Sequence, residues 1–335
     1  MLTHSWKTKG ICLYAPKPDE LDLFEEFIEK KLVPGGCNLI VMIVRYRYQF
    51  KSHPECIGHD APLSEADVKH MLQLCRKHNI RLVPKMNLMG HQSDNKGRDS
   101  IDGLLRGYPE FDETQEKDEV FYTRCLCPNH PEVRPIVLEL IDELVDVFEA
   151  DGMHIAIDEV FEIGKCSRCK DIPTYKILAN WVNTLADHLN ARGVQTMMWG
   201  DRLLNGLETD YGFWEASGNY TEPAINLVRK NILICDWHYG DREDFPSVDI
   251  FFEAGLRILV CTGPYNKERA KKFIKYAKEK DKGHIDGFLA TTWVDAGRLM
   301  RFILRNDDTG VTDWDRAMLE NLPQTLDWIF AVKGI

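Results

Sequence analysis

Residues 178–199 read LANWVNTLADHLNARGVQTMMW and contain the pattern that decides the fold. The first part places apolar side chains three and four residues apart, which is the period of an amphipathic helix. This helix is expected to end before Gly193, because glycine readily adopts the left-handed conformation that closes helices. An apolar run of strand length, residues 194–199, follows directly. The stretch therefore predicts a helix that leads into a buried strand.

The same alternation continues along the whole chain. Short apolar runs predict eight strands, at residues 10–15, 37–44, 80–88, 153–157, 194–199, 232–237, 256–262 and 288–293. Parallel strands need crossover connections and are buried on both faces. Eight apolar runs separated by helices therefore predict a parallel sheet covered by helices.

Amphipathic helical patterns lie between these runs. Ser64 followed by Asp67 is a helix N-cap signature, and apolar side chains at helical spacing come after it. One further pattern begins after Pro131, and two others cover residues 178–189 and 270–277. Weaker patterns cover residues 19–32, 223–229, 243–254 and 313–331.

The number of strands distinguishes the two architectures that have such a sheet, the open doubly wound sheet and the closed (β/α)8 barrel. An open doubly wound sheet usually has fewer strands, and one that binds a dinucleotide has a glycine-rich first turn, which residues 15–18 (APKP) do not form. The length of 335 residues also allows two domains, but no linker rich in proline, glycine or serine divides the chain. We expect one α/β domain, a (β/α)8 TIM barrel over residues 1–335, with a long βα loop at residues 90–131.

Composition excludes several classes of protein. The 42 Lys and Arg against 53 Asp and Glu give a net charge of −11, which disfavours nucleic acid and anionic membranes as partners. With 44% hydrophobic residues the chain can bury a large core. No run approaches the ~18 apolar residues of a membrane span, and the first residues lack the apolar region of a signal peptide. The expected location is cytoplasmic as the sequence stands, or secreted or periplasmic if a signal peptide preceded it.

Ten cysteines allow two interpretations. Three lie inside predicted strands and are expected in the core: Cys12, Cys235 and Cys261. Cys166 and Cys169 form a C-x-x-C pair, and Cys125 and Cys127 form a C-x-C pair. Together these four could hold a structural zinc, but the usual zinc-finger spacing is missing, so reduced thiols are the default and no cofactor is predicted.

Polar and aromatic residues follow five of the predicted strands. They are Asn87–His91, Asp158–Glu159, Trp199–Asp201, Trp237–Asp241 and Trp293–Asp295. Active sites of (β/α)8 barrels form from the loops after the strands. Aromatic rings stack on sugar faces and carboxylates bind sugar hydroxyls, so this mixture indicates a carbohydrate site. Any single Trp could instead be a core residue, and Asp201 could cap a helix.

The adjacent pair Asp158–Glu159 carries the sharpest signal. Neighbouring strand residues point to opposite faces, so both carboxylates can serve one site only where the strand ends and the chain turns. The segment His154-Ile-Ala-Ile-Asp158-Glu159 resembles the His-x-Gly-x-Asp-Glu signature of family 20 glycoside hydrolases, the β-N-acetylhexosaminidases. Four further segments resemble that family in order: Leu82–His91, Trp199, Tyr239-x-Asp241 and Trp293-x-Asp295.

This resemblance implies roles for three catalytic residues. Glu159 would be the general acid and then the base that activates water, with a pKa raised by burial and by the neighbouring carboxylate. Asp158 would orient the substrate's 2-acetamido group, whose carbonyl oxygen attacks the anomeric carbon to give an oxazolinium-like intermediate. Tyr239 would hydrogen-bond that oxygen. The residues implied in substrate binding are His91, His154, Trp199, Asp241, Trp293 and Asp295, of which His154 could equally be a core histidine.

Three positions depart from the family's pattern. Ala156 stands in place of a glycine, a change that a strand is expected to absorb, and Lys85 stands in place of an acidic residue. The first-strand arginine that grips sugar hydroxyls is missing, and Arg45 and Arg47 are candidates to replace it.

The function expected from the resemblance is that of a retaining exo-glycosidase. It would hydrolyse terminal β-linked GlcNAc or GalNAc by substrate-assisted catalysis, with a glycan or amino sugar as its partner, and a homodimer is compatible with the sequence. Because of the missing arginine, one alternative is a retired barrel that only binds carbohydrate. The other is a metal-dependent barrel hydrolase that uses His91, His154, Asp158 and cysteines, although closely spaced histidine pairs are absent.

Overall fold

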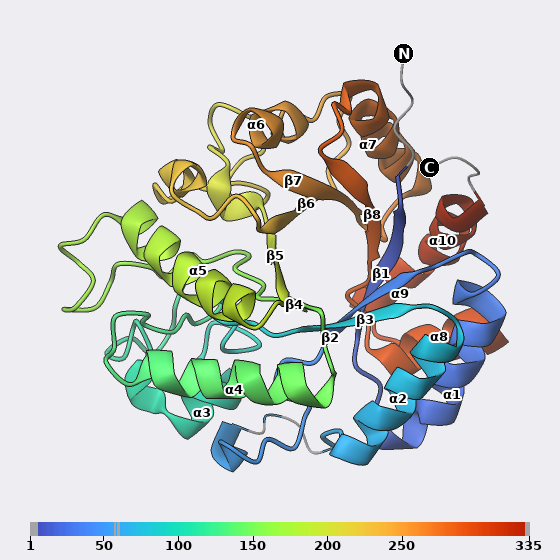
Figure 1. The fold of residues 1–335 in the computed structure, drawn as a ribbon, viewed down its shortest axis with the longest axis horizontal. Helices are drawn as coiled ribbons and strands as arrows, with labels where there is room; N and C mark the ends of the chain where they lie inside the picture. The colour runs from blue at the N-terminus through green and yellow to red at the C-terminus, as the bar shows by residue number, and fades with distance from the viewer. Residues whose placement is uncertain (1–5, 57, 59–60, 332–335) are drawn as a thin grey trace. The chain divides into compact units, whose positions relative to one another are not determined.

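The computed structural model describes residues 6–56, 58 and 61–331. Eight parallel strands follow one another in chain order in a closed barrel. Figure 1 labels these strands along the chain. They are β1 (Thr8–Tyr14), β2 (Leu39–Ile43), β3 (Arg81–Lys85), β4 (Gly152–His154), β5 (Gln195–Trp199), β6 (Leu233–His238), β7 (Arg257–Thr262) and β8 (Ile285–Thr291). The predicted (β/α)8 barrel and all eight strands are confirmed.

Helices separate the strands along the chain, except between β5 and β6, where the described residues form only 3-10 turns. They are α1 (Leu21–Phe27), α2 (Glu65–Lys77), α3 (Gly103–Gly107), α4 (Val133–Val147), α5 (Thr174–Ala191), α6 (Ser247–Glu253), α7 (Lys267–Lys280), α8 (Ala296–Arg305), α9 (Asp313–Leu319) and α10 (Leu322–Ala331). Short 3-10 or π-helical turns cover Pro18–Glu20, Ile28–Leu32, Pro54–Cys56, Arg98–Ser100, Pro109–Phe111, Asp201–Leu203 and Glu222–Asn226. The stretch 313–331 is two helices rather than one, and α3 and α8 were not predicted.

Contacts divide the chain into two compact units made of interleaved segments. The described residues of 1–43, 63–83 and 235–335 make the first unit, and those of 44–62 and 84–234 make the second. Each unit is therefore described by itself, and one domain over residues 1–335 stays a prediction.

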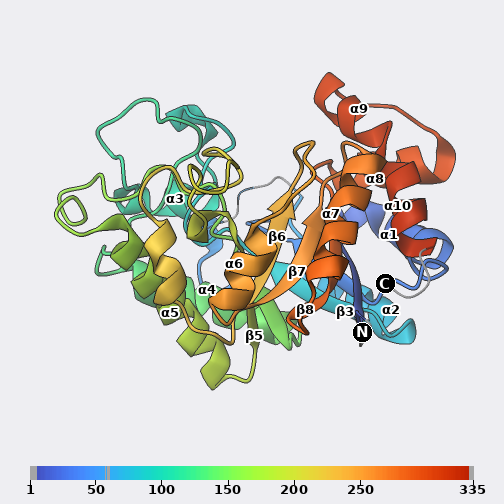
Figure 2. The same cartoon turned by 90° about the horizontal axis from the view of Figure 1, so that it is seen from above.

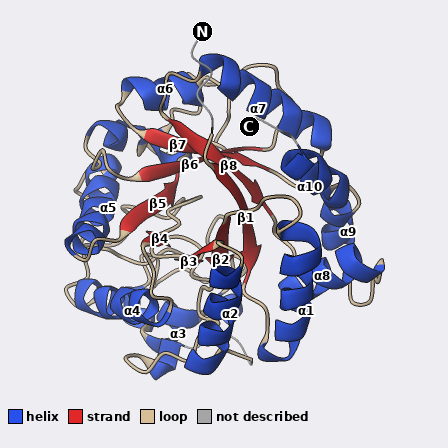
Figure 3. Ribbon diagram, turned by 45° about the vertical axis from the view of Figure 1, so that its right-hand side comes forward, coloured by secondary structure: helices blue, strands red, loops and turns tan. Residues whose placement is uncertain are grey.

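In the first unit, β1 is the central strand of a parallel set. It pairs with β2 and with β8, so that Gly10 lies opposite both Leu39 and Leu289. A Cβ at Gly10 would lie 2.8 Å from the Leu289 side chain, so the residue must be small. Helices α1 and α8 lie side by side outside these strands (Figure 3), and α7 runs along β7 (Figure 2).

In the second unit, β4 is a short strand between two partners. His154 pairs with Lys85 of β3 on one side and with Met197 of β5 on the other. Helix α4 buries the predicted apolar stripe, and Trp181 of α5 donates a hydrogen bond from Nε1 to the Leu88 carbonyl (2.8 Å). This bond ties α5 to the loop that follows β3.

Local signals in the sequence form as predicted. Ser64 caps α2 and exchanges hydrogen bonds with Asp67 in a capping box. All ten cysteines are free thiols, and Cys12, Cys235 and Cys261 are buried in the core as expected. Among the described residues, no helix has the length and apolar character needed to cross a membrane.

Candidate active site

The chain turns sharply just after β4. The strand ends at His154, and Ala156, Ile157 and Glu159 have φ values of 60°, 74° and 48°. Such left-handed backbone is unfavourable for residues with a Cβ, above all for a β-branched one, and it is typical of functional sites. The expectation that a strand absorbs Ala156 is wrong, because Ala156 lies beyond the strand in a conformation that suits the family's glycine.

This turn brings both carboxylates to one histidine. His91 Nε2 lies 3.3 Å from Asp158 Oδ2 and 3.2 Å from Glu159 Oε2. His91 itself has a φ of 53°, and its ring meets that of Tyr122 edge-on at 5.7 Å. The structure therefore brings together three of the residues that the sequence singled out: His91, Asp158 and Glu159.

The pKa values of the two carboxyl groups are shifted in opposite directions. Burial raises the pKa of Asp158, but the charges of His91 and Lys85 outweigh it and hold the pKa well below its usual range. Burial dominates for Glu159 and raises its pKa, as the sequence analysis expected. Burial lowers the pKa of His91, but the two carboxylates outweigh this and raise it to about 9. The group can therefore hold an imidazolium beside an ionised Asp158, and Glu159 is the carboxyl group of the pair that keeps its proton to the higher pH.

A buried lysine and a histidine lie beneath this group. Lys85 Nζ donates to Asn87 Oδ1 (3.2 Å) and lies 5.8 Å from the centre of the Trp199 ring. The His154 ring packs 4.6 Å from the ring of Trp199, which is itself fully buried. Burial, aided by the charge of Lys85, holds the pKa of His154 well below its usual value. His154 Nδ1 accepts a hydrogen bond from the Ala156 amide (3.0 Å), so this histidine is neutral and supports the turn.

An ion pair between Asp201 and Arg202 fixes the backbone of Glu159. Asp201 Oδ2 accepts hydrogen bonds from the Glu159 amide (2.9 Å) and from Arg202 Nε (2.6 Å). Arg202 also donates to the carbonyls of residues 213, 214 and 216, which fastens a loop to the same ion pair. The sequence analysis placed Asp201 among the strand-end residues of the site, with helix capping as the alternative, but it did not single out Arg202.

In the first unit, Tyr239 is held at its hydroxyl by two side chains. Its hydroxyl lies 2.7 Å from Thr291 Oγ1 and accepts a hydrogen bond from Trp293 Nε1 (3.1 Å). Burial raises the pKa of Tyr239 well above its usual value, so the phenol keeps its proton. A Cβ at Gly263 would lie 2.5 Å from the Tyr239 ring, which shows how closely the next strand end approaches it.

The remaining predicted residues have structural partners of their own. Asp241 is mostly exposed and pairs with Lys272 (2.8 Å), while Asp295 caps α8 by accepting from the Arg298 amide (3.3 Å). Arg45, a candidate for the missing arginine, donates to Asp94 (3.0 Å) and to the His91 carbonyl (3.0 Å). It therefore anchors the loop that carries His91. Sugar contacts of these residues stay predictions.

Two groups of side chains among the described residues have the spacing of metal ligands. One is His91, Asp158 and Glu159, and the other is Glu113, Cys127, Cys166 and Cys169. The alternative of a barrel metallohydrolase expected His154 and cysteines to join His91 and Asp158, whereas the structure places the cysteines in the other group.

A closed (β/α)8 barrel with a carboxylate pair just past its fourth strand, of which Asp158 is buried and Glu159 partly exposed, defines a barrel glycoside hydrolase. The chain belongs to glycosyl hydrolase family 20, whose catalytic domain matches residues 46–296. The resemblance inferred from the sequence is thereby confirmed.

Several known proteins that are similar to the chain are longer than it is. A β-hexosaminidase of Akkermansia muciniphila is 25% identical over 269 residues, which cover 73% of this chain and 51% of that protein. The chain thus spans about half the length of this curated relative. A chitobiase from Flavobacterium johnsoniae has the same fold, with a TM-score of 0.66 at 18% identity over 97% of this chain and 52% of that one. Dispersin B has a TM-score of 0.55 at 14% identity, with 97% and 98% covered.

Proposed function

We propose that this protein is a retaining exo-glycosidase that removes terminal β-linked N-acetylhexosamine by substrate-assisted catalysis. The observation that carries the proposal is the group of His91, Asp158 and Glu159, in which the pKa of one carboxyl group is lowered and that of its neighbour is raised. Family membership and the hexosaminidase relative agree with this assignment.

The first chemical step uses each carboxyl group in the state that its surroundings favour. Ionised Asp158 accepts a hydrogen bond from the N–H of the 2-acetamido group and orients it. The acetamide carbonyl oxygen then attacks the anomeric carbon, and the bond from that carbon to the leaving oxygen breaks. Glu159 gives its proton to the leaving oxygen, so the aglycone departs as a neutral alcohol and the sugar forms an oxazolinium ion.

The second step returns Glu159 to its starting state. Its carboxylate takes a proton from water, and the water oxygen attacks the anomeric carbon and reopens the ring with net retention. The His91 imidazolium, 3.2 Å away, stabilises the negative charge that Glu159 carries between the steps. The imidazolium interacts more strongly with Glu159 after the proton has left than before. It therefore stabilises the transition state more than the bound substrate, which lowers the barrier of the reaction.

Two further residues are assigned by family resemblance. Tyr239, which keeps its phenolic proton, would donate a hydrogen bond to the acetamide oxygen and so hold it in position for attack on the anomeric carbon. Trp293, which donates to Tyr239, would hold that hydroxyl in place. The choice between GlcNAc and GalNAc would depend on contacts to the sugar hydroxyls. The family resemblance assigns these contacts to Asp241 and Asp295.

The test compares wild type with Glu159→Gln and Asp158→Asn on aryl β-N-acetylglucosaminides and galactosaminides. Loss of a general acid or base typically costs about 10²- to 10⁴-fold in kcat. Glu159→Gln should lose less activity as the leaving group improves, because a good leaving group needs no proton. Asp158→Asn should lose activity with every leaving group. Glu253→Gln, an exposed carboxylate on α6, is the matched control.

A second candidate rests on the missing first-strand arginine, namely a barrel that binds sugar without cleaving it. Calorimetry on wild type distinguishes the two functions. Heat of binding with N-acetylhexosamine and no turnover on any of the aryl glycosides would favour the binding protein and overturn the proposed hydrolase.

A further inference from the structure

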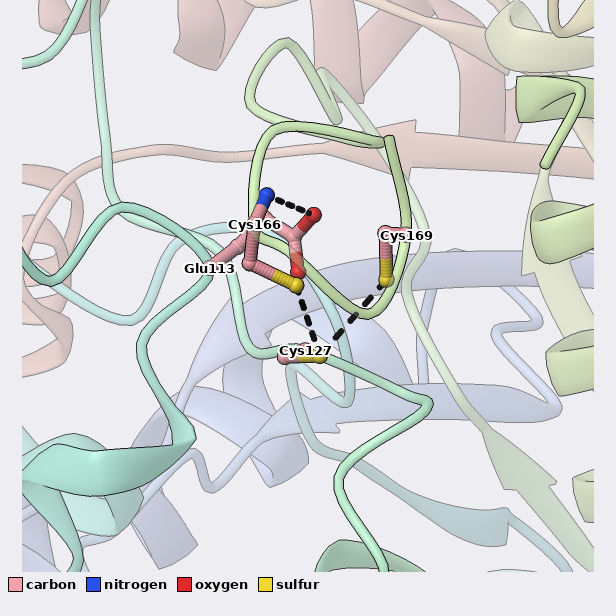
Figure 4. A group of neighbouring side chains, drawn as sticks. All are labelled: Glu113, Cys127, Cys166 and Cys169. Atoms are coloured by element: carbon pink, nitrogen blue, oxygen red, sulfur yellow. Dashed lines mark hydrogen bonds between the residues drawn. The ribbon is translucent and has the colours of Figure 1, made fainter. Parts of the chain in front are cut away.

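A second cluster of reactive side chains lies outside the candidate active site. Glu113 and Cys127 come from the long loop between β3 and α4, and Cys166 and Cys169 come from the loop between β4 and α5. Figure 4 shows both thiols of the C-x-x-C pair turned toward Cys127, with the Glu113 carboxylate beside Cys166. Four potential ligand atoms therefore converge from two loops that are separate in sequence.

The distances in this cluster fit a single tetrahedral ion. Cys127 Sγ lies 3.4 Å from Cys166 Sγ and 3.6 Å from Cys169 Sγ, and all four ligand atoms lie within 4.8 Å of one another. Sulfurs bound to one Zn²⁺ at about 2.3 Å would be about 3.8 Å apart in a tetrahedron. A modest expansion of the cluster would therefore make room for the ion.

The backbone around the cluster is arranged as in metal-binding turns. The amides of Cys169 (3.0 Å) and Lys170 (2.9 Å) both donate to the Cys166 carbonyl, which closes a tight turn between the two cysteines. Asn129 Nδ2 donates to Cys169 Sγ (3.3 Å). A hydrogen bond donated to sulfur stabilises the thiolate form, which is the form that binds metals.

The Glu113 carboxylate gives independent evidence that the cluster binds a cation. Its Oε1 accepts from the amides of Lys165 (2.7 Å) and Cys166 (3.1 Å), which fixes the orientation of the carboxyl group. The residue is 2% exposed, and its Oε2 is buried without a hydrogen-bond partner among the described residues. A buried carboxylate oxygen costs free energy unless it is paired, so a cation would satisfy it.

We propose that Glu113, Cys127, Cys166 and Cys169 bind one structural Zn²⁺. Three thiolates and one carboxylate are ligands that zinc accepts, and four protein ligands leave no open position for catalysis. The sequence suggested Cys125 in place of Glu113. The structure corrects this, because residues 111–113 pair with residues 125–127 and bring Glu113 to the cluster, while Cys125 lies outside it.

The site would join two loops that also meet beside the candidate active site. The Phe121 and Phe161 rings pack edge-on at 5.1 Å, and Glu162 Oε1 accepts from the Phe121 amide (3.0 Å). Phe161 lies two residues after Glu159, and Phe121 precedes Tyr122, whose ring meets that of His91. Zinc would thus hold in place the loops that position the carboxylate pair.

The test is metal analysis of the purified full chain, expressed with zinc and passed through a desalting column. We expect one zinc per chain in wild type and in Cys75→Ala, which removes a buried cysteine of α2. We expect loss of stoichiometric zinc in Cys169→Ala. Glu113→Gln should retain three thiolates but lose zinc to a competing chelator at concentrations at which wild type keeps it.

A second measurement does not depend on the variants folding. Wild type reloaded with Co²⁺ should show the sulfur-to-cobalt charge-transfer band and the strong visible bands of a tetrahedral thiolate site. Zinc removal should lower the melting temperature by at least about 5 °C, and zinc should restore it.

Three results would overturn the proposal. They are wild type without bound zinc whose thiols remain free, a disulfide between Cys127 and either partner in protein kept under reducing conditions, and full zinc content in Cys169→Ala. Glu159→Gln should keep its zinc, so failure of the hydrolase assignment and failure of this site can be told apart.

Discussion

Replacing His91 with glutamine removes the cation that lies between Asp158 and Glu159. His91 has an ordinary pKa of 6.5 and a pKa of about 9 in the folded protein, and its side chain is 19% exposed. One pKa unit corresponds to about 1.4 kcal/mol, so the folded protein favours the charged histidine by about 3 kcal/mol. Loss of one partner from a buried ion pair costs a similar amount, about 3–5 kcal/mol.

The pH dependence follows from the sign of the shift. Because the folded-state pKa is raised, the stabilisation from His91 is fully present below pH 6.5 and is lost as pH rises through about 9. His91→Gln should therefore lower the free energy of unfolding by about 3 kcal/mol near pH 6, by about 1 kcal/mol near pH 8 and by little above pH 9.

The assay is urea unfolding of wild type and His91→Gln across this range of pH. His188→Gln is the matched control, because His188 forms an ion pair with Asp142 (2.7 Å) at the surface, where such pairs contribute less than about 1 kcal/mol. A loss of stability in His91→Gln that stays constant with pH, or grows above pH 8, would refute the assigned ion pair.

Four other substitutions have defined outcomes. Ala156→Gly should raise the melting temperature, since the left-handed conformation costs an alanine about 1 kcal/mol, and Gly193→Ala, with a φ of 72°, should lower it by a similar amount in calorimetry. Lys85→Met should move the acidic limb of the pH–rate profile to higher pH, because the charge of Lys85 helps to lower the pKa of Asp158. Tyr239→Phe should reduce kcat about 10²-fold in steady-state assays, because the acetamide oxygen is no longer held in position, without changing the fold by circular dichroism.

Most of the barrel could be predicted because its signals are local. Apolar runs of strand length, the capping pair Ser64 and Asp67, and the glycine at 193 all act within a few residues, and each forms the expected element. Helix α8 was missed although Asp295 stands at its N-cap, because that residue was assigned to sugar binding instead.

The candidate site was predictable only in part, because some of its contacts join distant segments. His91 and the carboxylate pair could be found from motifs at strand ends. The ion pair of Asp201 and Arg202 under Glu159 depends on how the loop at residues 213–216 folds back, and no motif encodes this. Glu113 reaches the cysteines through pairing of two segments within a loop that has little regular structure.

The most direct test of substrate assistance changes the substrate rather than the protein. Aryl N-acetylglucosaminides whose acetamide carries one, two or three fluorine atoms have a progressively weaker carbonyl nucleophile. Measured kcat/KM should fall steeply with each fluorine if that oxygen attacks the anomeric carbon. A kcat/KM that stays constant across the series would contradict substrate-assisted catalysis and point to a nucleophile supplied by the protein or by water.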